Sequence, residues 1–183
     1  MTWEGLTPPY RTIVADPPWH YEGFARGDSP SSPEVTQWGL PYSGLSVPDI
    51  CALPVAALAA RDSRVFLWTT NRYLPESFAV VSAWGFGYVQ LLIWEKGNAS
   101  PFGGSVAPNS AEFVLVAKKG NPPVAGRWAS SVFRATRGHI HSQKPGLFLD
   151  LVEHVSPGPY VELFARQPRL GWDAWGYGVE GVA

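Results

Sequence analysis

Short runs of β-branched and aromatic residues recur along the chain, and glycine, proline or other turn-forming residues bound each of them. Runs of this length and composition predict β-strands. We predict strands over residues 11–15, 64–69, 87–94, 112–118 and 160–165. The polar segments between them then hold the helices and loops.

Three segments between these runs carry helix signals. Ser46 is an N-cap candidate with Asp49 three residues later, and we expect that helix to run toward Ala60, broken into two pieces at Pro54. Residues 75–84 begin with proline and end before Gly85, and residues 145–155 are followed by Ser-Pro-Gly. Strands alternating with helices predict one α/β domain over residues 1–183, with helices on both faces of the sheet.

Long segments rich in glycine, proline and polar residues cover 22–41, 97–110 and 119–143. Loops of this length in compact domains are usually functional or mobile. We expect them to gather at the carboxyl ends of the strands, where open α/β sheets bind ligands.

Composition narrows the class of protein. Apolar residues make up 45% and charged residues 16%, which excludes a disordered chain, and the formal net charge of −1 gives no global attraction to nucleic acid or membrane. One cysteine and an N-terminus without a signal-peptide pattern predict a cytoplasmic protein. The longest aliphatic stretch, residues 55–60, cannot cross a bilayer, and His139 and His141 lack a third ligand, so we expect no metal.

The sequence Asp16-Pro17-Pro18-Trp19 directly follows the first predicted strand. It ends that strand, because proline cannot donate to a ladder, and it places a carboxylate at the strand's carboxyl end. The exocyclic amine of adenine is a poor nucleophile, and methylating it requires acceptors that hold its N–H groups. Asp16 and the carbonyl of Pro17 would be these acceptors, with Trp19 as a stacking surface. An ordinary turn with a core tryptophan is the alternative.

The chain resembles the adenine-N6 methyltransferases related to the catalytic subunit of the mRNA methyladenosine writer, a family with small bacterial and phage members. The resemblance runs over about residues 10–178 and rests on ADPPW, LPY, FLWTTN, WGF, IWEK, an acidic residue opening a VLV strand, HSQKP and ELFAR, in that order. It implies a Rossmann-like, S-adenosylmethionine-dependent methyltransferase fold with a mostly parallel sheet and a permuted motif order, in which the catalytic motif precedes the cofactor-binding strand.

The resemblance also implies the site residues. Asp16, Pro17, Pro18 and Trp19 match the catalytic motif. The implied cofactor-binding residues are Asp16, Ser142, Lys144, Glu162 and Arg166. The implied contacts to the acceptor adenine are Tyr42, Trp68, Trp94, Lys96 and Glu112. For Trp68 and Trp94 a core position is an equal alternative, and for Glu112 a solvated carboxylate is. The chain departs from the family after Trp175-Gly176, where Tyr177 takes the place of the usual asparagine and could stack on the cofactor instead.

Positive charge is concentrated late in the chain. No acidic residue lies between Glu112 and Asp150, while that stretch holds Arg127, Arg134 and Arg137 with Trp128 and Phe133 interleaved. Such a stretch fits a surface that contacts phosphates and stacks bases, and a solvated basic face is the alternative.

We therefore expect a methyltransferase that uses S-adenosylmethionine to methylate the adenine amino group in DNA or RNA. The adenine would be single-stranded or flipped out of a duplex, because a duplex hides its amino group. A second subunit or a homodimer could add the surface for contacting the nucleic acid that a chain of this size lacks. The alternatives are the same chemistry on a small adenine-containing molecule and an inactive nucleic-acid-binding partner of another subunit.

Overall fold

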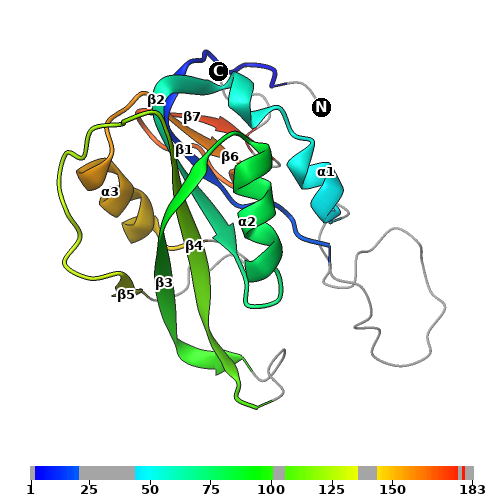
Figure 1. Ribbon diagram of the computed structural model, residues 1–183. Helices are drawn as coiled ribbons and strands as arrows, with labels where there is room; N and C mark the ends of the chain where they lie inside the picture. Colours follow the sequence, from blue (N-terminus) through cyan, green and yellow to red (C-terminus); the bar gives the residue numbers. More distant parts are fainter. Residues whose placement is uncertain (1–2, 21–43, 101–105, 136–143, 177–178, 180–183) are drawn as a thin grey trace.

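The structure is a computed structural model that describes residues 3–20, 44–100, 106–135, 144–176 and 179. Within these residues seven strands form one sheet with helices on both faces (Figure 1). The strands are β1 (Tyr10–Ala15), β2 (Ala59–Thr69), β3 (Gly87–Ser100), β4 (Asn109–Lys119), β5 (Val132–Arg134), β6 (Tyr160–Leu163) and β7 (Trp172–Trp175). The helices are α1 (Val47–Cys51), α2 (Leu74–Ala83) and α3 (Gly146–Val155), and a 3-10 turn covers Val55–Ala57.

The strand order is β5-β3-β4-β2-β1-β6-β7. β1 is parallel to both of its neighbours, β2 and β6, and the pairs β6–β7 and β3–β5 are parallel as well. Only β4 among these strands runs against its neighbours, β2 and β3. The expected α/β architecture with a mostly parallel sheet is therefore confirmed.

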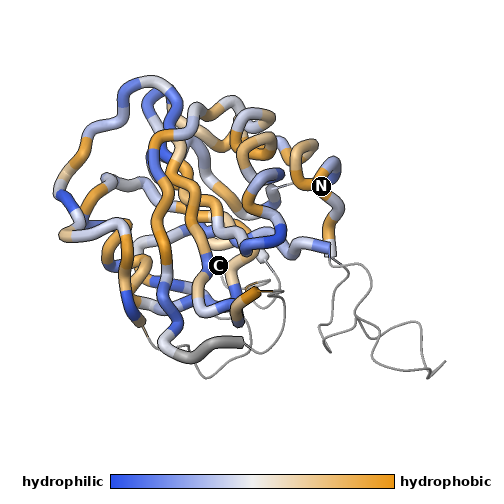
Figure 2. Tube along the Cα trace, turned by 60° about the horizontal axis from the view of Figure 1, so that its bottom comes forward, coloured by the Kyte–Doolittle hydropathy of each residue, from blue (hydrophilic) through white to orange (hydrophobic). Residues whose placement is uncertain are grey.

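Alternate residues of the central strands point to opposite faces of the sheet, and both faces are covered. On one face Ile13 and Leu67 pack with α1 and α2. On the other, Val14, Phe66 and Trp68 pack with α3. Strands buried on both faces read as continuous apolar runs, as these do. In Figure 2 the same strands form the orange, hydrophobic interior, and blue hydrophilic segments lie mainly outside it.

The helices begin and end close to their predicted residues. The Ser46 hydroxyl accepts the backbone N–H of Asp49 at 3.3 Å, which confirms the predicted N-cap. Pro54 separates α1 from the 3-10 turn, as expected, but β2 already begins at Ala59, so the segment does not stay helical to Ala60. None of the helices in the described part of the chain has the length and apolar character needed to cross a membrane.

Two strands and part of one loop differ from the prediction. β5 and β7 have three and four residues and were not predicted, because runs this short carry no distinct period. Much of the loop expected over 97–110 is strand, since β3 continues to Ser100 and β4 begins at Asn109. The loop expected over 22–41 lies outside the described residues.

The direction of β4 also changes where one loop starts. We expected the segment 119–143 to gather with the other loops at the carboxyl ends of the parallel strands. Because β4 is antiparallel, the chain leaves Lys119 at the opposite edge of the sheet. It then passes along the α3 side before it reaches β5 (Figure 1).

Trp84, which follows α2, provides a test of this packing. It is 1% exposed, and its indole N–H donates to the carbonyl of Ile50 at 2.8 Å, which joins α2 to α1. We expect Trp84→Ala to lower the free energy of unfolding by about 3–5 kcal/mol, because it leaves a large cavity. Denaturant titration would measure this loss. Leu170→Ala, at a fully exposed position, is the control and should change stability by less than about 0.5 kcal/mol. A loss below about 1 kcal/mol for Trp84→Ala would contradict the packing described here.

Candidate active site

Asp16 lies directly after β1, in the middle of the sheet. Its backbone N–H donates to the carbonyl of Leu163, the last residue of the neighbouring strand β6, at 3.4 Å. Ala15 before it is fully buried. The carboxylate therefore projects from the carboxyl edge of three adjacent parallel strands, where ligands bind in open α/β sheets.

The prolines after Asp16 form a tight turn that is tied to a neighbouring segment. The Pro17 carbonyl accepts the N–H of Trp19 at 2.9 Å, and the Pro18 carbonyl accepts the N–H of Leu45 at 2.7 Å. A carbonyl oxygen has two lone pairs, so the Pro17 oxygen can accept a further N–H. The turn thus places a carboxylate and a fixed carbonyl one residue apart.

Trp19 is part of the core. It is 7% exposed, its ring stacks on Tyr73 at a centroid distance of 5.0 Å, and its indole N–H donates to the Trp68 carbonyl at 3.2 Å. This corrects the expectation of an open stacking surface for a base at Trp19. The motif's tryptophan anchors the turn, because the ring fills a site between β2 and the start of α2.

Four charged side chains from different parts of the chain, Asp16 among them, meet at this edge of the sheet. The Lys144 ammonium lies 2.8 Å from Asp16 Oδ2 and 3.2 Å from Glu112 Oε2. Glu112 also forms an ion pair with Lys96. The four side chains are between 12% and 20% exposed. The structure thus brings together residues that the sequence analysis assigned to different ligands, Asp16 and Lys144 to the cofactor and Lys96 and Glu112 to the acceptor adenine.

Burial and mutual attraction determine how these groups ionise. Burial raises the pKa of Asp16 above its ordinary value, against the attraction of Lys144. Burial alone would lower the pKa of Lys144, but Asp16 and Glu112 outweigh it and raise that pKa. Burial alone would raise the pKa of Glu112, but Lys144 and Lys96 outweigh it and lower that pKa. Lys144 is therefore a firmly protonated cation between two carboxyl groups.

Two tryptophans were predicted to contact the acceptor adenine, and they take different places. Trp68 is buried but lines the cavity described below, with the Lys144 ammonium 5.1 Å from its ring centroid. Trp94 is 2% exposed and donates its N–H to the carbonyl of Ala135 at 2.9 Å. Its ring lies beneath Lys96 at 5.5 Å. For Trp94 the structure favours the core alternative.

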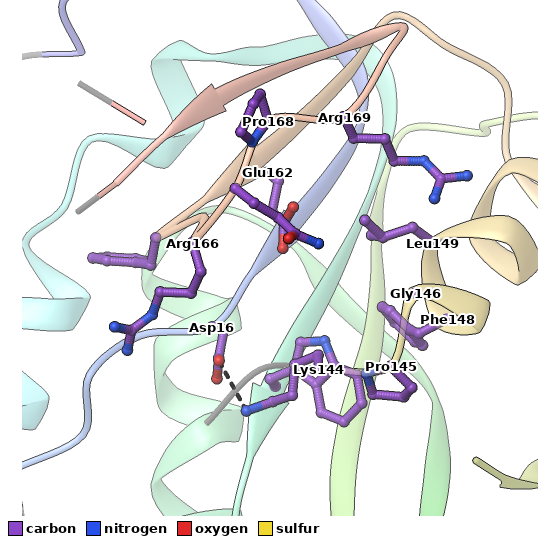
Figure 3. Close-up of a pocket in the computed structure, with 13 residues that line it drawn as sticks. Asp16, Lys144, Pro145, Gly146, Phe148, Leu149, Glu162, Arg166, Pro168 and Arg169 are labelled. Carbon is purple, nitrogen blue, oxygen red and sulfur yellow. Dashed lines mark ion pairs between the residues drawn. The ribbon is translucent and has the colours of Figure 1, made fainter. Parts of the chain in front are cut away.

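A cavity of about 270 Å³ opens beside this charge cluster. Asp16, Lys144, Glu162 and Arg166 all line it, so acidic and basic groups face one space (Figure 3). Pro145, the residue before α3, also lines the cavity. A cavity with a carboxylate and an ammonium side by side can hold the charged tail of an amino acid, which itself carries one ammonium and one carboxylate.

Glu162 and the turn that follows it form another part of the cavity wall. Burial and the nearby charge of Asp16 raise the pKa of Glu162 to about 7. Phe164, two residues later, has a φ of 65°, in the left-handed region that side chains other than glycine rarely adopt. The N–H of Ala165 donates to the Trp175 carbonyl at 3.0 Å and holds this turn. The turn brings Arg166 back toward Asp16, and strain of this kind concentrates at functional sites (Figure 3).

Arg169 is a lining residue that the sequence analysis missed. It forms ion pairs with Asp150 at 2.6 Å and Glu153 at 2.9 Å, both on α3. Glu153 also accepts the indole N–H of Trp172 at 2.6 Å. These contacts fasten the segment between β6 and β7 to α3 and fix the width of the cavity. Arg169 lies 16 and 19 residues after its two partners, so no contiguous motif in the sequence marks it.

The remaining predicted residues are not part of this cluster. Arg134 is exposed and forms an ion pair with Glu95 at 2.8 Å. Arg127 lies near the other edge of the sheet, beside a second cavity. Phe133 is 8% exposed, and Trp128 donates its N–H to the Leu151 carbonyl at 2.6 Å, so both pack in the core and not on a base-stacking surface. The predicted residues outside the described part of the chain are Tyr42, Arg137, Ser142 and Tyr177.

Within the described residues, no three histidine, cysteine, aspartate or glutamate side chains are grouped so that they could hold a metal ion. His139 and His141 lie outside these residues.

Comparison with known proteins identifies the family of this chain. The MT-A70 family model matches residues 10–178. A type II methyltransferase of Mycoplasma, M.MunI, is 32% identical over 91% of this chain and 76% of its own length. The MT-A70-like N(6)-adenosine-methyltransferase of Drosophila melanogaster is 29% identical over 94% of this chain, and the human catalytic subunit METTL3 is 26% identical over 94%. This chain spans only 27% and 29% of the lengths of these last two proteins. The chain therefore belongs to the MT-A70 family and is a methyltransferase.

Proposed function

We propose that this protein transfers a methyl group from S-adenosylmethionine to the N6 amino group of adenine in a nucleic acid. The observation that carries the proposal is the position of Asp16 at the carboxyl end of β1, in one cavity with Lys144, Glu162 and Arg166. The Asp16 carboxylate faces a cavity that can hold a charged amino acid tail, and the Pro17-Pro18 turn follows it directly.

The residues of the cavity fit this cofactor. Its methionine part carries an ammonium, which Asp16 would bind, and a carboxylate, which Lys144 would bind. The 2.8 Å ion pair between the two side chains would then be exchanged for two ion pairs with the tail. Glu112 continues to hold Lys144 during this exchange, so the lysine stays in place. Glu162 and Arg166 would contact the ribose.

The same turn can orient the amine that accepts the methyl group. The exocyclic amine of adenine donates two hydrogen bonds, and its lone pair is delocalised into the ring. The Asp16 carboxylate and the Pro17 carbonyl would each accept one N–H and so aim the lone pair. Such fixed acceptors stabilise the positive charge that develops on nitrogen during transfer. Asp16 therefore borders both the cofactor and the acceptor.

The bound cofactor supplies an electrophilic methyl group on a positively charged sulfur. Its transfer would form the nitrogen–carbon bond as the sulfur–carbon bond breaks, with the bonding electrons left on sulfur. The transiently cationic amine then loses a proton to water or to Asp16. Catalysis consists of positioning and hydrogen bonding, so no side chain needs to become a covalent nucleophile.

The names of two relatives support adenine as the acceptor, and the charge of one stretch of the chain supports a polyanion. The human relative is named for N(6)-adenosine, and a relative in Mus musculus is named an N(6)-adenine-specific methyltransferase. The stretch between Glu112 and Asp150 contains no acidic residue, and its Arg127 and Arg134 are exposed. Within this proposal the acceptor is single-stranded or unpaired adenine, since a duplex must be opened to present its amino group.

Transfer of a labelled methyl group tests the proposal directly. The protein would be incubated with tritiated S-adenosylmethionine and, in separate reactions, single-stranded DNA, duplex DNA, RNA and adenosine. The modified nucleoside would then be identified after digestion. We expect N6-methyladenine in single-stranded polymer. Asp16→Asn should lower turnover by a factor on the order of 100 or more, because it replaces an acceptor with N–H donors. Asp49→Asn, at an exposed position on α1, is the matched control and should stay within about twofold.

Three other outcomes of this experiment would contradict the proposal. Near wild-type turnover of Asp16→Asn at saturating cofactor would contradict the mechanism. Methylation of adenosine but of no polymer would establish the small-molecule alternative. No methylation of any acceptor would support the inactive-partner alternative.

The raised pKa of Glu162 predicts how cofactor affinity depends on pH. Below about pH 7 the side chain is protonated and loses acceptor capacity for ribose hydroxyls. Affinity for S-adenosylmethionine should therefore weaken as the pH falls below 7, by up to about tenfold per pH unit, and level off above it. Calorimetry between pH 5.5 and 8.5 would measure this dependence. Glu162→Gln cannot titrate, so its affinity should lack the step near pH 7. An unchanged step in that variant would assign the titration to another group.

A further inference from the structure

A second cavity, of about 440 Å³, lies on the same face of the sheet as α3 but toward the opposite edge from Asp16. Strands β2, β3 and β4, the segment 124–131 and the end of α3 enclose it, and we name it the Arg64 pocket. Arg64 and Trp68 are on the same face of β2, and Trp68 lines the first cavity. Four residues of a strand span about 13 Å, so the two cavities are separate sites.

Arg64 is a buried cation in this pocket. It is 8% exposed, and its guanidinium donates to Ser156 Oγ at 2.9 Å and to the carbonyls of Pro122 and Pro123 at 3.4 Å each. In the part of the chain that the structure describes, no ion pair joins it to a carboxylate. Asp62, two residues earlier on β2, accepts the N–H of Asn121 instead. Buried charges are usually paired, so an unneutralised arginine favours an anion from outside the chain.

The rest of the lining fits an anion that carries an apolar or planar group. Arg127 is exposed beside the pocket and adds a second positive charge. Gln90, Ser130 and Ser131 contribute neutral polar groups, and none of the described lining residues is acidic. Phe66, Leu92 and Val116 form an apolar floor. The volume is within the range of pockets that hold small molecules.

Hydrogen bonds hold the segment 124–131, which forms one wall of the pocket, in place. The N–H of Ala125 donates to the Val155 carbonyl at 3.0 Å, and the N–H of Ile93 donates to the Ser131 carbonyl at 2.8 Å. With the hydrogen bond from Trp128 to Leu151, these contacts hold both ends and the middle of the segment against the sheet and α3. If Arg64 served only to hydrogen-bond this segment to the sheet, a neutral donor would be sufficient. That structural role explains neither the buried positive charge nor the cavity beside it.

We propose that the Arg64 pocket binds a nucleotide, with the phosphate between Arg64 and Arg127 and the base against the apolar floor. The choice of a nucleotide among such anions rests on the proposed function. A phosphate of the acceptor strand and a free nucleotide offer the same chemistry here. The pocket is thus a binding site distinct from the one at Asp16.

Titration calorimetry with uridine 5′-monophosphate tests the proposal on the full chain, because this probe has no adenine that could enter the methylation site. Gln90→Glu keeps the size of an exposed lining side chain and adds a negative charge. Arg127→Glu replaces a positive charge at the pocket by a negative one. We expect each to raise the dissociation constant about tenfold or more. Arg61→Glu makes the same charge reversal at an exposed position outside the pocket and should change it less than about twofold. Arg64→Met should also abolish binding, and Gln90→Glu carries the test if that variant fails to fold.

A uridine octanucleotide, titrated over a series of salt concentrations, identifies the source of the phosphate. If only the octanucleotide binds, and Gln90→Glu weakens it while Arg61→Glu does not, the pocket holds part of a strand. If the mononucleotide binds with the same pattern, the pocket accepts a free nucleotide. If Gln90→Glu and Arg61→Glu do not differ for either probe, the proposal is wrong. Methyl transfer by the unmodified protein to an adenine oligonucleotide is measured separately, so failure of the pocket and failure of the proposed function are distinguishable.

Discussion

The position of Lys144 between Asp16 and Glu112 is the interaction on which the rest of the site depends. Its ammonium lies within 3.2 Å of both carboxylates, and all three side chains are largely buried. Leaving any of these charges unpaired would be costly, because a buried charge without a partner loses its hydration without compensation. The end of β1, the start of β4 and the chain before α3 are therefore required to meet at one place.

This requirement explains several features at the carboxyl edge of the sheet. The Pro17-Pro18 turn ends β1 where the carboxylate is needed, and the buried Trp19 anchors that turn. The left-handed Phe164 turns the chain after β6 so that Arg166 faces the same cavity. Arg169 fastens the opposite side to α3 through two ion pairs. The result is a preorganised site in which one ion pair can be exchanged for two when a zwitterionic ligand binds.

Much of this could be predicted from the sequence, because long apolar strands and a contiguous motif are local signals. The central strands and the place of Asp16 at the end of the first one follow from periodicity and from proline chemistry. The direction of β4 does not, since β4 is buried on both faces and therefore has the same continuous apolar run as its parallel neighbours. That direction moves Arg127 to the far edge of the sheet, away from Arg134. Whether an aromatic residue such as Trp19 packs in the core or faces a ligand depends on its neighbours in space, here Tyr73.

The central claim is that Lys144 binds the carboxylate of the cofactor's methionine part, and a comparison of two ligands tests it most directly. Calorimetry would measure the affinity of Lys144→Ala and of the unmodified protein for S-adenosylmethionine and for its decarboxylated form, with Lys118→Ala as an exposed control on β4. The account predicts that Lys144→Ala raises the dissociation constant of S-adenosylmethionine about tenfold or more relative to its effect on the decarboxylated form, because only the former carries the charge that Lys144 pairs with. An equal effect on both ligands, or none on either, would contradict it.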